Sequence, residues 1–327
     1  MLNVQIYPDG GVIMADLFTE IKGKLQSKNV TIILPEGNDP RIIEAALKLQ
    51  AEGVIQPIVI GNERDIPSGL QVLNPATYEH MDELVNAFVE RRNGKVTIEE
   101  AREILKDVNY FGTMLVYTKK ADGLVSGAAH TTAETVRPAL QIIKTKPGIT
   151  KTSGAFLMVK NDTRYIFADC AITIAPTSDD LAEIAVEGAK TAAAFGIEPK
   201  VAMLSFSTKG SAKSEETDKV VQATRLARER APQLVIEGEL QFDASIVPSI
   251  ADKKAPGATV RGDANVFVFP SLESGNIGYK IAERLGGFEA IGPILQGLNA
   301  PVNDLSRGCN AEDVYKLAYI TAAQALD

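Results

Sequence analysis

Residues 30–60, VTIILPEGNDPRIIEAALKLQAEGVIQPIVI, carry the pattern that decides the fold of this chain. Two short apolar runs rich in β-branched side chains, Val30–Leu34 and Pro57–Ile60, predict buried strands. The stretch between them, Arg41–Gln50, places its apolar side chains at helical spacing. A strand, a helix and a second strand in this order predict an α/β protein built on a parallel sheet.

The alternation of helices and strands continues through the N-terminal half. One further short strand is predicted at Gly123–Ser126. Further helices are predicted at Met81–Arg92, Ile98–Lys106, Tyr110–Lys119 and Ala133–Ile143. The N-terminal lobe is therefore expected to be α/β throughout.

A second lobe is expected beyond the turn formers of Lys144–Ser153. Its first two strands, Ala155–Val159 and Arg164–Asp169, are close enough in sequence to form a hairpin. Alternating helices and strands follow at Leu181–Ala194, Lys200–Ser205, Glu216–Arg230 and Asn265–Pro270. A hairpin joined to such units predicts a mixed sheet. The last helix, Ala311–Ala325, fits either lobe by its pattern alone.

Composition limits the classes of function. With 327 residues, of which 45% are hydrophobic, the chain is able to bury the cores of two lobes. A net charge of -8 and a pI of about 5.1 argue against a nucleic-acid-binding or membrane-binding surface. No apolar run approaches the roughly 20 residues that span a bilayer. Residues 1–13 lack a secretory pattern and precede a second methionine, so we expect a leader without functional residues.

Cysteine and histidine are scarce in this chain. The two cysteines, Cys170 and Cys309, provide no disulfide framework and favour a reducing cytoplasm. The two histidines, His80 and His130, are too few for a structural zinc site. Cys309 has no histidine near it in sequence, so we expect a structural thiol there instead of an acyl-accepting nucleophile.

The segment most dense in reactive groups is NDLSRGCNAED at residues 303–313. Its groups suit the transfer of an acyl group between a thiol and phosphate. That chemistry needs a proton acceptor, positive charge for the phosphate, and a donor to the developing oxyanion. Asp313, Arg307 and Ser306 would supply these three groups in turn.

A second segment, GAAHTTAETVR at residues 127–137, follows a predicted strand and opens a helix. Such turns are where α/β sheets bind ligands. Thr132 and Thr135 would donate hydrogen bonds, and the free backbone amides of the helix start would attract an oxyanion such as phosphate. Arg137 would complete the positive charge of this phosphate site.

Both segments also have a purely structural interpretation. Asn310 and Asp313 have the spacing of a capping box at a helix start, where a carboxylate also suits the helix dipole. Thr131 and Glu134 have the same spacing, and Glu134 is placed to form an ion pair with Arg137. Spacing alone leaves the structural and the catalytic interpretation open.

A third segment, SFSTKGSAKS at residues 205–214, has hydroxyls, a glycine and two lysines between a strand and a helix. Its candidate phosphate-contacting residues are Ser207, Lys209, Ser211 and Lys213. The glycine and lysine spacing is not that of a Walker A motif, so ATP hydrolysis is not supported. A solvated turn is the alternative. Weaker signals are Asn276, Arg284 and Arg91, and a basic residue at a helix C-terminus is also favourable on electrostatic grounds alone.

From about Met14 to Leu326 the sequence resembles the bacterial phosphate acetyltransferase (phosphotransacetylase) family. The most specific blocks are DGLVSGAAH at 122–130, TVRPALQ at 135–141, and residues 204–214 and 301–309. The resemblance implies a homodimer of two-domain α/β subunits like isocitrate or isopropylmalate dehydrogenase, with the active site in the inter-domain cleft. It places residues 14–152 and 299–327 in domain I and residues 153–298 in domain II.

The resemblance also implies the reaction acetyl-CoA + phosphate = CoA + acetyl phosphate, in the acetate metabolism of the cytoplasm. Asp313 would be the base for the coenzyme A thiol, Arg307 the binder of phosphate, and Ser306 a polarising donor. Arg137 and Arg91 match arginines that contact the phosphoryl group or coenzyme A. Further contacts to coenzyme A are expected from Ser207, Lys209, Ser211, Lys213, Asn276 and Arg284.

We expect the coenzyme A thiolate to attack acetyl phosphate directly in a ternary complex. No acyl-enzyme, cofactor, metal, nucleic acid or membrane partner is expected, and coenzyme A is a substrate. Three rivals stay open: an acyltransferase that prefers butyryl groups, a metal- and NAD-dependent decarboxylating dehydrogenase, and a non-catalytic coenzyme A sensor. The dehydrogenase would need a cluster of aspartates for its metal ion that the sequence does not provide.

Overall fold

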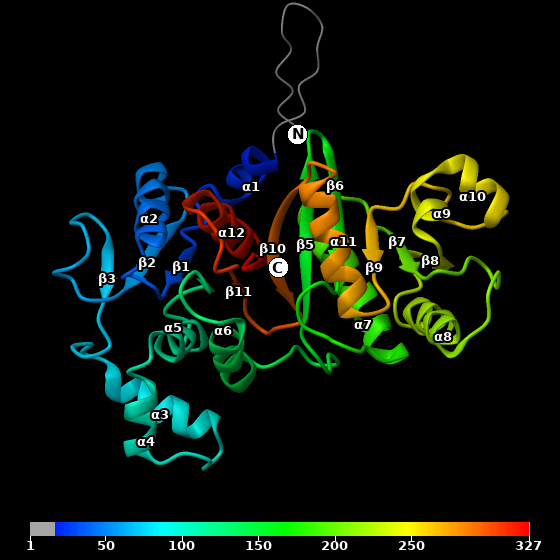
Figure 1. Cartoon of the computed structure of the whole chain (residues 1–327). Coiled ribbons are helices and arrows are strands. Elements are labelled where there is room, and N and C mark those ends of the chain that lie inside the picture. Colours follow the sequence, from blue (N-terminus) through cyan, green and yellow to red (C-terminus); the bar gives the residue numbers. More distant parts are fainter. Residues whose placement is uncertain (1–16, 327) are drawn as a thin grey trace, which may run out of the picture. The chain divides into compact units, whose positions relative to one another are not determined.

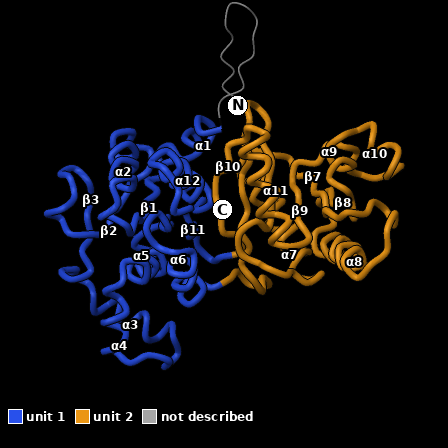
Figure 2. The backbone as a smooth tube through the Cα atoms, viewed as in Figure 1, with its two compact units in different colours: residues 1–144, 298–327 blue, residues 145–297 orange. Residues whose placement is uncertain are grey.

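The computed structural model describes residues 17–326, so the expected leader at residues 1–13 lies outside the described part of the chain. The chain divides into two compact units (Figure 2). Unit 1 combines residues 1–144 with residues 298–327, and unit 2 consists of residues 145–297. Unit 1 is therefore discontinuous in sequence.

Unit 2 begins earlier than the domain II that was predicted to start at Ser153. The Thr150 amide donates to Glu183 Oε2 at 3.0 Å, and Lys151 Nζ lies 2.9 Å from Asp180 Oδ2. Both carboxylates belong to α7 (Ser178–Ala194), a helix of unit 2. These bonds attach the segment before the first strand of unit 2 to that unit.

Unit 1 is built on a parallel sheet with the strand order β11-β4-β1-β2-β3, of which Figure 1 labels all strands but β4. The strands are β1 (Thr31–Leu34), β2 (Gln56–Ile60), β3 (Gln71–Leu73), β4 (Gly123–Ser126) and β11 (Val302–Asp304). The chain runs from β1 outward to β3, and β4 then returns to the other side of β1. The order therefore reverses between β1 and β4, which makes this the topological switch point of the sheet.

The helices of unit 1 follow local signals in the sequence. α2 (Pro40–Glu52) begins at Asp39, whose side chain accepts a bond from the Arg41 amide, and it ends at Gly53 in the left-handed region. The other helices are α1 (Leu17–Leu25), α3 (Met81–Arg91), α4 (Ile98–Ile104), α5 (Val108–Tyr117), α6 (Thr132–Pro138) and α12 (Ala311–Gln324). Helix α12, which its pattern alone leaves unassigned, contacts α2, α1 and β4 in unit 1.

Unit 2 has a mixed sheet with the strand order β10-β5-β6-β9-β7-β8. β5 pairs antiparallel with β6 and β10, as the predicted hairpin requires, and the remaining pairs are parallel. The strands are β5 (Ser153–Lys160), β6 (Thr163–Ala168), β7 (Lys200–Leu204), β8 (Val235–Leu240), β9 (Val266–Val268) and β10 (Glu289–Gln296). Besides α7, the helices are α8 (Glu215–Arg230), α9 (Phe242–Ile246), α10 (Pro248–Lys254) and α11 (Leu272–Arg284).

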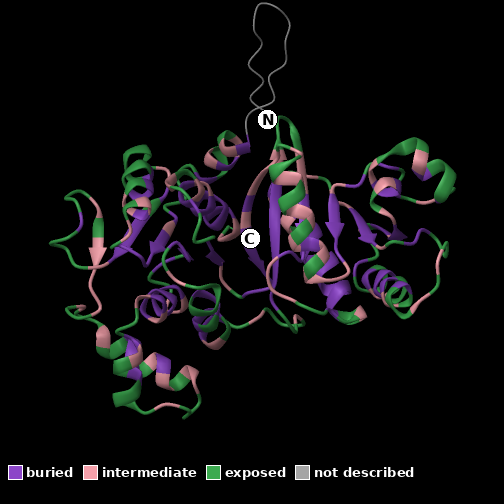
Figure 3. Ribbon diagram, viewed as in Figure 1, coloured by how far each residue is buried: buried purple, intermediate pink, exposed green. Residues whose placement is uncertain are grey.

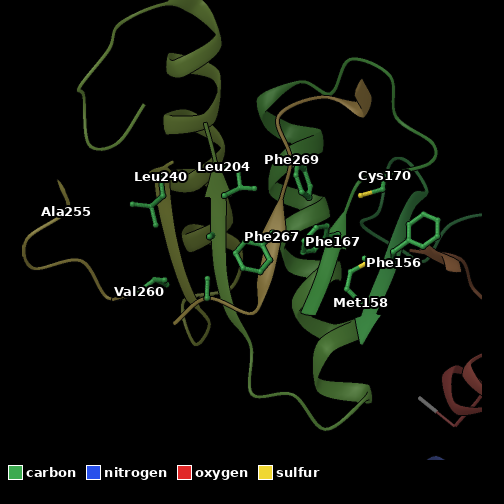
Figure 4. Packing of buried hydrophobic residues seen from close by; sticks show 12 residues of the cluster. Phe156, Met158, Phe167, Cys170, Leu204, Leu240, Ala255, Val260, Phe267 and Phe269 are labelled. Atoms are coloured by element: carbon green, nitrogen blue, oxygen red, sulfur yellow. The ribbon is translucent and has the colours of Figure 1, made fainter. Parts of the chain in front are cut away.

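Buried strands form the centre of each unit, and the helices expose one face to solvent (Figure 3). In unit 2 the core is aromatic, and Phe167 and Phe267 meet edge to face with 5.4 Å between ring centroids (Figure 4). Phe156, Met158 and Leu204 belong to the same buried cluster. Burial of such side chains is the main source of stability for each unit.

Several elements differ from the predicted ones. The helix predicted at residues 133–143 is observed as α6 followed by a π-helical turn, η1 (Ala139–Ile143), because Pro138 has no amide to donate and disturbs a regular turn. The sequence pattern does not predict β3, β8, β10 or β11. β3 and β11 have three residues each, and Gly292 and Pro293 interrupt β10. No helix in residues 17–326 is both long and apolar enough to cross a membrane.

Candidate functional site at the switch point of unit 1

Three loops leave the carboxyl ends of neighbouring strands at the switch point of unit 1. Residues 35–39 follow β1, residues 127–131 follow β4, and residues 305–310 follow β11. Ligands of open α/β sheets bind in the crevice at this end of the strands. The structure therefore brings two segments that the sequence singled out, 127–137 and 303–313, to one edge of one sheet.

The loop after β4 is held by a buried carboxylate. Glu36 Oε2 accepts bonds from the Gly127 and Ala128 amides at 3.1 and 2.9 Å. Glu36 Oε1 accepts bonds from the Ala129 and His130 amides at 2.8 and 2.9 Å, and from His130 Nδ1 at 2.8 Å. These four amides, which precede the helix start at Thr131, are therefore occupied by a carboxylate of the chain, and the expected attraction of phosphate to the amides of the helix start itself stays a prediction.

Arg41 connects the two loops. Its Nη1 donates to the backbone oxygens of Arg307 and Cys309 at 2.8 and 2.9 Å, and its Nη2 donates to that of Ala128 at 2.6 Å. Asp39 orients the guanidinium with bonds of 2.9 and 2.7 Å. The bond from Arg41 lowers the pKa of Asp39, so the pair stays charged and holds both loops.

The predicted catalytic residues lie in the loop after β11 and at the start of α12. Ser306 and Arg307 are exposed, and the Ser306 hydroxyl accepts a bond from the Gly308 amide at 3.2 Å. The Arg307 side chain forms no hydrogen bond or ion pair with any other residue in the described part of the chain. A fixed backbone with an unpaired, exposed guanidinium suits the binding of an anion.

The structural role predicted for Asp313 is present. The Asn310 amide donates to Asp313 Oδ2 at 2.9 Å, and the Asp313 amide donates to Asn310 Oδ1 at 3.0 Å. These two bonds form a capping box at the start of α12. Asp313 is half-buried and adjoins the loop that carries Arg307.

Cys309 fits the expected structural thiol. Its side chain is buried, and this burial raises the pKa of the thiol to about 11, although the nearby Arg41 charge opposes the rise. A thiol with such a pKa has almost no thiolate at neutral pH, and the thiolate is the nucleophilic form. Cys309 is therefore a poor acyl acceptor.

Helix α6 places three predicted residues beside β11. Thr132 donates to Asp304 Oδ2 at 2.6 Å, and the buried Thr135 hydroxyl acts on the same carboxyl group by lowering its pKa. The capping box of Thr131 and Glu134 is present, and the Glu134 carboxylate accepts bonds from the amide and hydroxyl of that threonine. The alternative ion pair between Glu134 and Arg137 is not formed, which leaves the exposed Arg137 without an ion pair in the described chain.

Arg91 lies at the end of α3, and its guanidinium already donates to backbone oxygens of unit 1. Its Nε donates to the Ile142 oxygen at 2.6 Å, and its Nη2 donates to the Ile143 oxygen at 3.0 Å. The guanidinium also lies 4.9 Å from the ring centre of Tyr117. These contacts fix the end of η1, the turn that continues α6, so the direct role of Arg91 in binding phosphate or coenzyme A stays a prediction.

Asp304 is a functional candidate that the sequence did not single out. Its carboxyl group is buried, and this burial raises its pKa to about 6 although the Thr132 and Thr135 hydroxyls oppose the rise. Oδ1 has no partner within the described residues. A Cβ atom on Gly127, where φ is +110°, would collide with that oxygen, so only glycine fits there.

Unit 2 contains the third predicted segment, and most of its polar groups bond to unit 2 itself. The Ser207 hydroxyl donates to the buried Glu239 at 2.9 Å, and it lies 3.3 Å from the Ser211 hydroxyl. Lys209 Nζ lies 2.5 Å from Glu237 Oε1. Lys213, in contrast, is exposed and forms no ion pair with residues 17–326.

Glu237 is the carboxylate with which Lys209 forms its ion pair. Its carboxylate is buried, yet its pKa is lowered to about 2: burial opposes the shift, but bonds from Lys209 and the Thr259 amide and the charge of Arg228 prevail. Lys209 is therefore paired with a buried carboxylate, although its own side chain is 37% exposed. Its contact to coenzyme A remains a prediction, as does that of Lys213.

Asn276 and Arg284, two of the three weaker candidates, lie on α11. Asn276 donates to the Cys170 oxygen at 3.1 Å and accepts from Lys280 at 2.8 Å, so both ends of its amide have partners. The Arg284 side chain is 78% exposed and lies 3.3 Å from Glu283. In the described chain, no group of three or more histidine, cysteine or acidic side chains is arranged to hold a metal ion.

Comparison with known proteins gives consistent matches. Residues 16–322 match the family model described as phosphate acetyl/butaryl transferase. A phosphate acetyltransferase of Bacillus subtilis is 65% identical over 323 residues, which cover 96% of this chain and 100% of that protein. Solved structures of phosphotransacetylases from Staphylococcus aureus and Streptococcus pyogenes are 62% and 57% identical, with TM-scores of 0.91 and 0.92. Each covers 95% of this chain and 98% of its own.

More distant structures share the fold alone. A branched-chain phosphotransacylase of Enterococcus faecalis is 21% identical with a TM-score of 0.66, and covers 90% of this chain and 99% of its own. A structure named as a 4-hydroxythreonine-4-phosphate dehydrogenase from Salmonella typhimurium is 14% identical with a TM-score of 0.50. It covers 91% of this chain and 100% of its own. This likeness concerns the fold alone, which is of the two-domain α/β kind that the sequence resemblance implies.

Proposed function

Because the chain belongs to the phosphate acetyl/butaryl transferase family and acts as a phosphate acetyltransferase, we propose that the thiolate of coenzyme A attacks acetyl phosphate directly in a ternary complex. The sulfur forms a bond to the carbonyl carbon, and the carbonyl oxygen becomes an oxyanion. The bond from that carbon to the phosphate oxygen then breaks, and phosphate leaves with the electron pair. The proton of the thiol passes to Asp313 and from there to phosphate or solvent.

The observation that carries this proposal is the unpaired guanidinium of Arg307 on a backbone that Arg41 holds from inside the unit. Arg307 would bind the phosphoryl group and neutralise the charge that grows on it as it leaves. Ser306, the preceding residue, would donate to the oxyanion of the acetyl group. Arg137, which is also exposed and unpaired in the described chain, would supply a second positive charge.

The state of the candidate nucleophiles supports direct attack over an acyl-enzyme. Covalent catalysis needs a nucleophile with a lowered pKa or an adjacent base. Burial raises the pKa of the Cys309 thiol to about 11. The bond recorded for the Ser306 hydroxyl is to the Gly308 amide, which is a donor and not a base. Neither side chain is activated in the way that an acyl-enzyme requires.

Coenzyme A is proposed as a substrate, and we propose that no metal or redox cofactor takes part. In unit 2, Lys213 is the lysine of the 205–214 loop whose charge is available for a phosphate of coenzyme A. The family resemblance further suggests a homodimer. Analytical ultracentrifugation of the purified protein at micromolar concentration would give the mass of a single chain if this suggestion is wrong.

The test is to mix coenzyme A, acetyl phosphate and purified protein and to follow the loss of free thiol. Asp313→Asn should lower kcat by about 100-fold or more with little change in KM, because the amide cannot accept the thiol proton. Glu312→Gln is the matched control, since Glu312 is the adjacent exposed carboxylate and pairs with Lys48. A loss under about tenfold in Asp313→Asn would leave Asp313 with its capping role alone.

Two further measurements address the mechanism and its rivals. Incubation with labelled acetyl phosphate alone should leave no label on the protein, and a stable acyl-protein would contradict direct attack. Rates with acetyl and butyryl phosphate decide the acyl preference, which the family description leaves open. A coenzyme A sensor would bind coenzyme A without consuming its thiol.

A further inference from the structure

Glu36 is a fully buried carboxylate at the switch point, and the proposed reaction does not use it. It lies in the loop between β1 and α2, and its side chain has no exposed surface. Four successive backbone amides, from Gly127 to His130, donate to its two oxygens, and Oε1 also accepts a bond from His130 Nδ1. The Glu36 side chain thereby joins the loop after β1 to the loop after β4.

The arrangement of these amides is that of an anion site. Successive backbone amides that point at one centre form a concave nest, and such nests bind carboxylates and phosphates. In this chain the nest is filled from within by Glu36. The charge of a substrate phosphate is thereby kept away from these amides and left to the exposed arginines of the neighbouring loops.

The nest also fixes groups of the candidate site. Ala128, whose amide donates to Glu36, accepts a bond from Arg41 through its oxygen, and the same guanidinium holds the Arg307 and Cys309 oxygens. Gly127 packs so closely on Asp304 and Leu305 that it has no room for a Cβ. A shift of the 127–130 loop would therefore move the backbone that carries Arg307, and the start of α6, which carries Arg137.

We propose that Glu36 is a positioning residue for the acyl transfer, because it fills the amide nest of residues 127–130 and so fixes the loops that carry Arg137 and Arg307. The inference rests on the proposed function of those arginines. Glu36 acts on the reaction through the backbone and does not touch the substrates.

The experiment compares Glu36→Gln and Glu36→Ala with Glu52→Gln in the thiol assay. Glutamine keeps the size but presents an amide group to amide donors, so we expect kcat to fall by about 100-fold, the cost of a small misplacement of reacting groups. The KM for acetyl phosphate should change by less than about threefold, since both arginines remain. Glu52 is a matched control, because its carboxylate accepts bonds from Tyr315 and Tyr319 in the same unit but away from the switch point.

Chemical rescue separates positioning from a general loss of stability. In Glu36→Ala the nest is empty, so added formate should restore kcat at least about tenfold with saturation. Formate should not raise the kcat of the unaltered protein or of Glu52→Gln. If Glu36→Ala does not fold, the split between kcat and KM in Glu36→Gln carries the test, with a thermal midpoint measured for each variant.

The outcomes separate this inference from the proposed function. If Glu36→Gln keeps kcat within about threefold of the unaltered protein, Glu36 stabilises the fold without positioning the site, and the inference is overturned. The same follows if formate fails to rescue a folded Glu36→Ala. If the unaltered protein itself consumes no thiol, the proposed function fails first. Activity of the unaltered protein together with a saturable rescue supports both.

Discussion

Asp304→Asn should make the protein more stable at neutral and alkaline pH. The carboxyl group of Asp304 is 1% exposed, and one of its oxygens has no partner in the described chain. Burial is the main cause that raises its pKa to about 6, and the nearby charge of Glu36 adds to it. Asparagine has a similar shape, keeps an oxygen for the Thr132 hydroxyl, and carries no charge to bury.

The sign and size of the effect follow from linkage. A raised pKa means that the folded chain holds the proton more strongly than the unfolded chain, so stability falls as pH rises from about 4 to about 6. Relative to the ordinary value of 3.8, the shift of the pKa to about 6 means that ionised Asp304 lowers the free energy of unfolding by about 3 kcal/mol above pH 6. At about pH 4.5 the same relation gives a loss of about 1 kcal/mol. The gain from asparagine should thus grow by about 2 kcal/mol between these two conditions.

Urea unfolding of both proteins at about pH 4.5 and about pH 8 measures this growth, because contributions of other groups cancel in the difference. Asp162→Asn, in the exposed turn between β5 and β6, is the control and should show no such growth. A difference between Asp304→Asn and the unaltered protein that is the same at both pH values would refute the reasoning. It would mean that Asp304 is not ionised at a cost in the folded chain.

Two further predictions concern residues whose surroundings settle their role. Cys309→Ala should keep kcat within about twofold in the thiol assay, because a thiol with a pKa of about 11 is not the acyl acceptor, and a loss above about tenfold would contradict this. Lys209→Met should lower the free energy of unfolding by about 1 kcal/mol, since it removes one of several partners of buried Glu237, which keeps Arg228 and Thr259. Lys213→Met, in the same loop, should change the free energy of unfolding by less than about 0.5 kcal/mol. If urea unfolding shows equal losses for the two lysine variants, the ion pair of Lys209 does not stabilise the fold.

Local patterns in the sequence were enough to predict many of the regular elements and two helix caps, although not the strands β3, β8, β10 and β11. The first strand, helix and second strand lie within two residues of their predicted bounds. Both capping boxes, Thr131 with Glu134 and Asn310 with Asp313, were read from spacing and are present. These features depend on residues within one helical turn of each other, so their spacing in sequence fixes their geometry.

The partners of charged groups could not be predicted in the same way. Glu36 binds amides 91 to 94 positions away, and Arg41 binds an oxygen 268 positions away. Their one local signal is the segment PEGNDPR at residues 35–41, between β1 and the first turn of α2. Only the strand order shows that this segment lies at the switch point. Residue type shows that a side chain is charged, whereas the fold decides whether that charge has a partner within the chain.

The capping and catalytic interpretations of Asp313 do not exclude each other. The cap uses Asp313 Oδ2, which accepts the Asn310 amide, and a carboxylate has lone pairs on both oxygens. The same bond fixes the orientation of the side chain, which a general base needs as much as a helix start does. Asparagine at this position still offers an oxygen to the Asn310 amide but cannot take a proton from a thiol. A large loss of kcat in Asp313→Asn, with the start of α12 intact, would therefore report the proton transfer and not the cap.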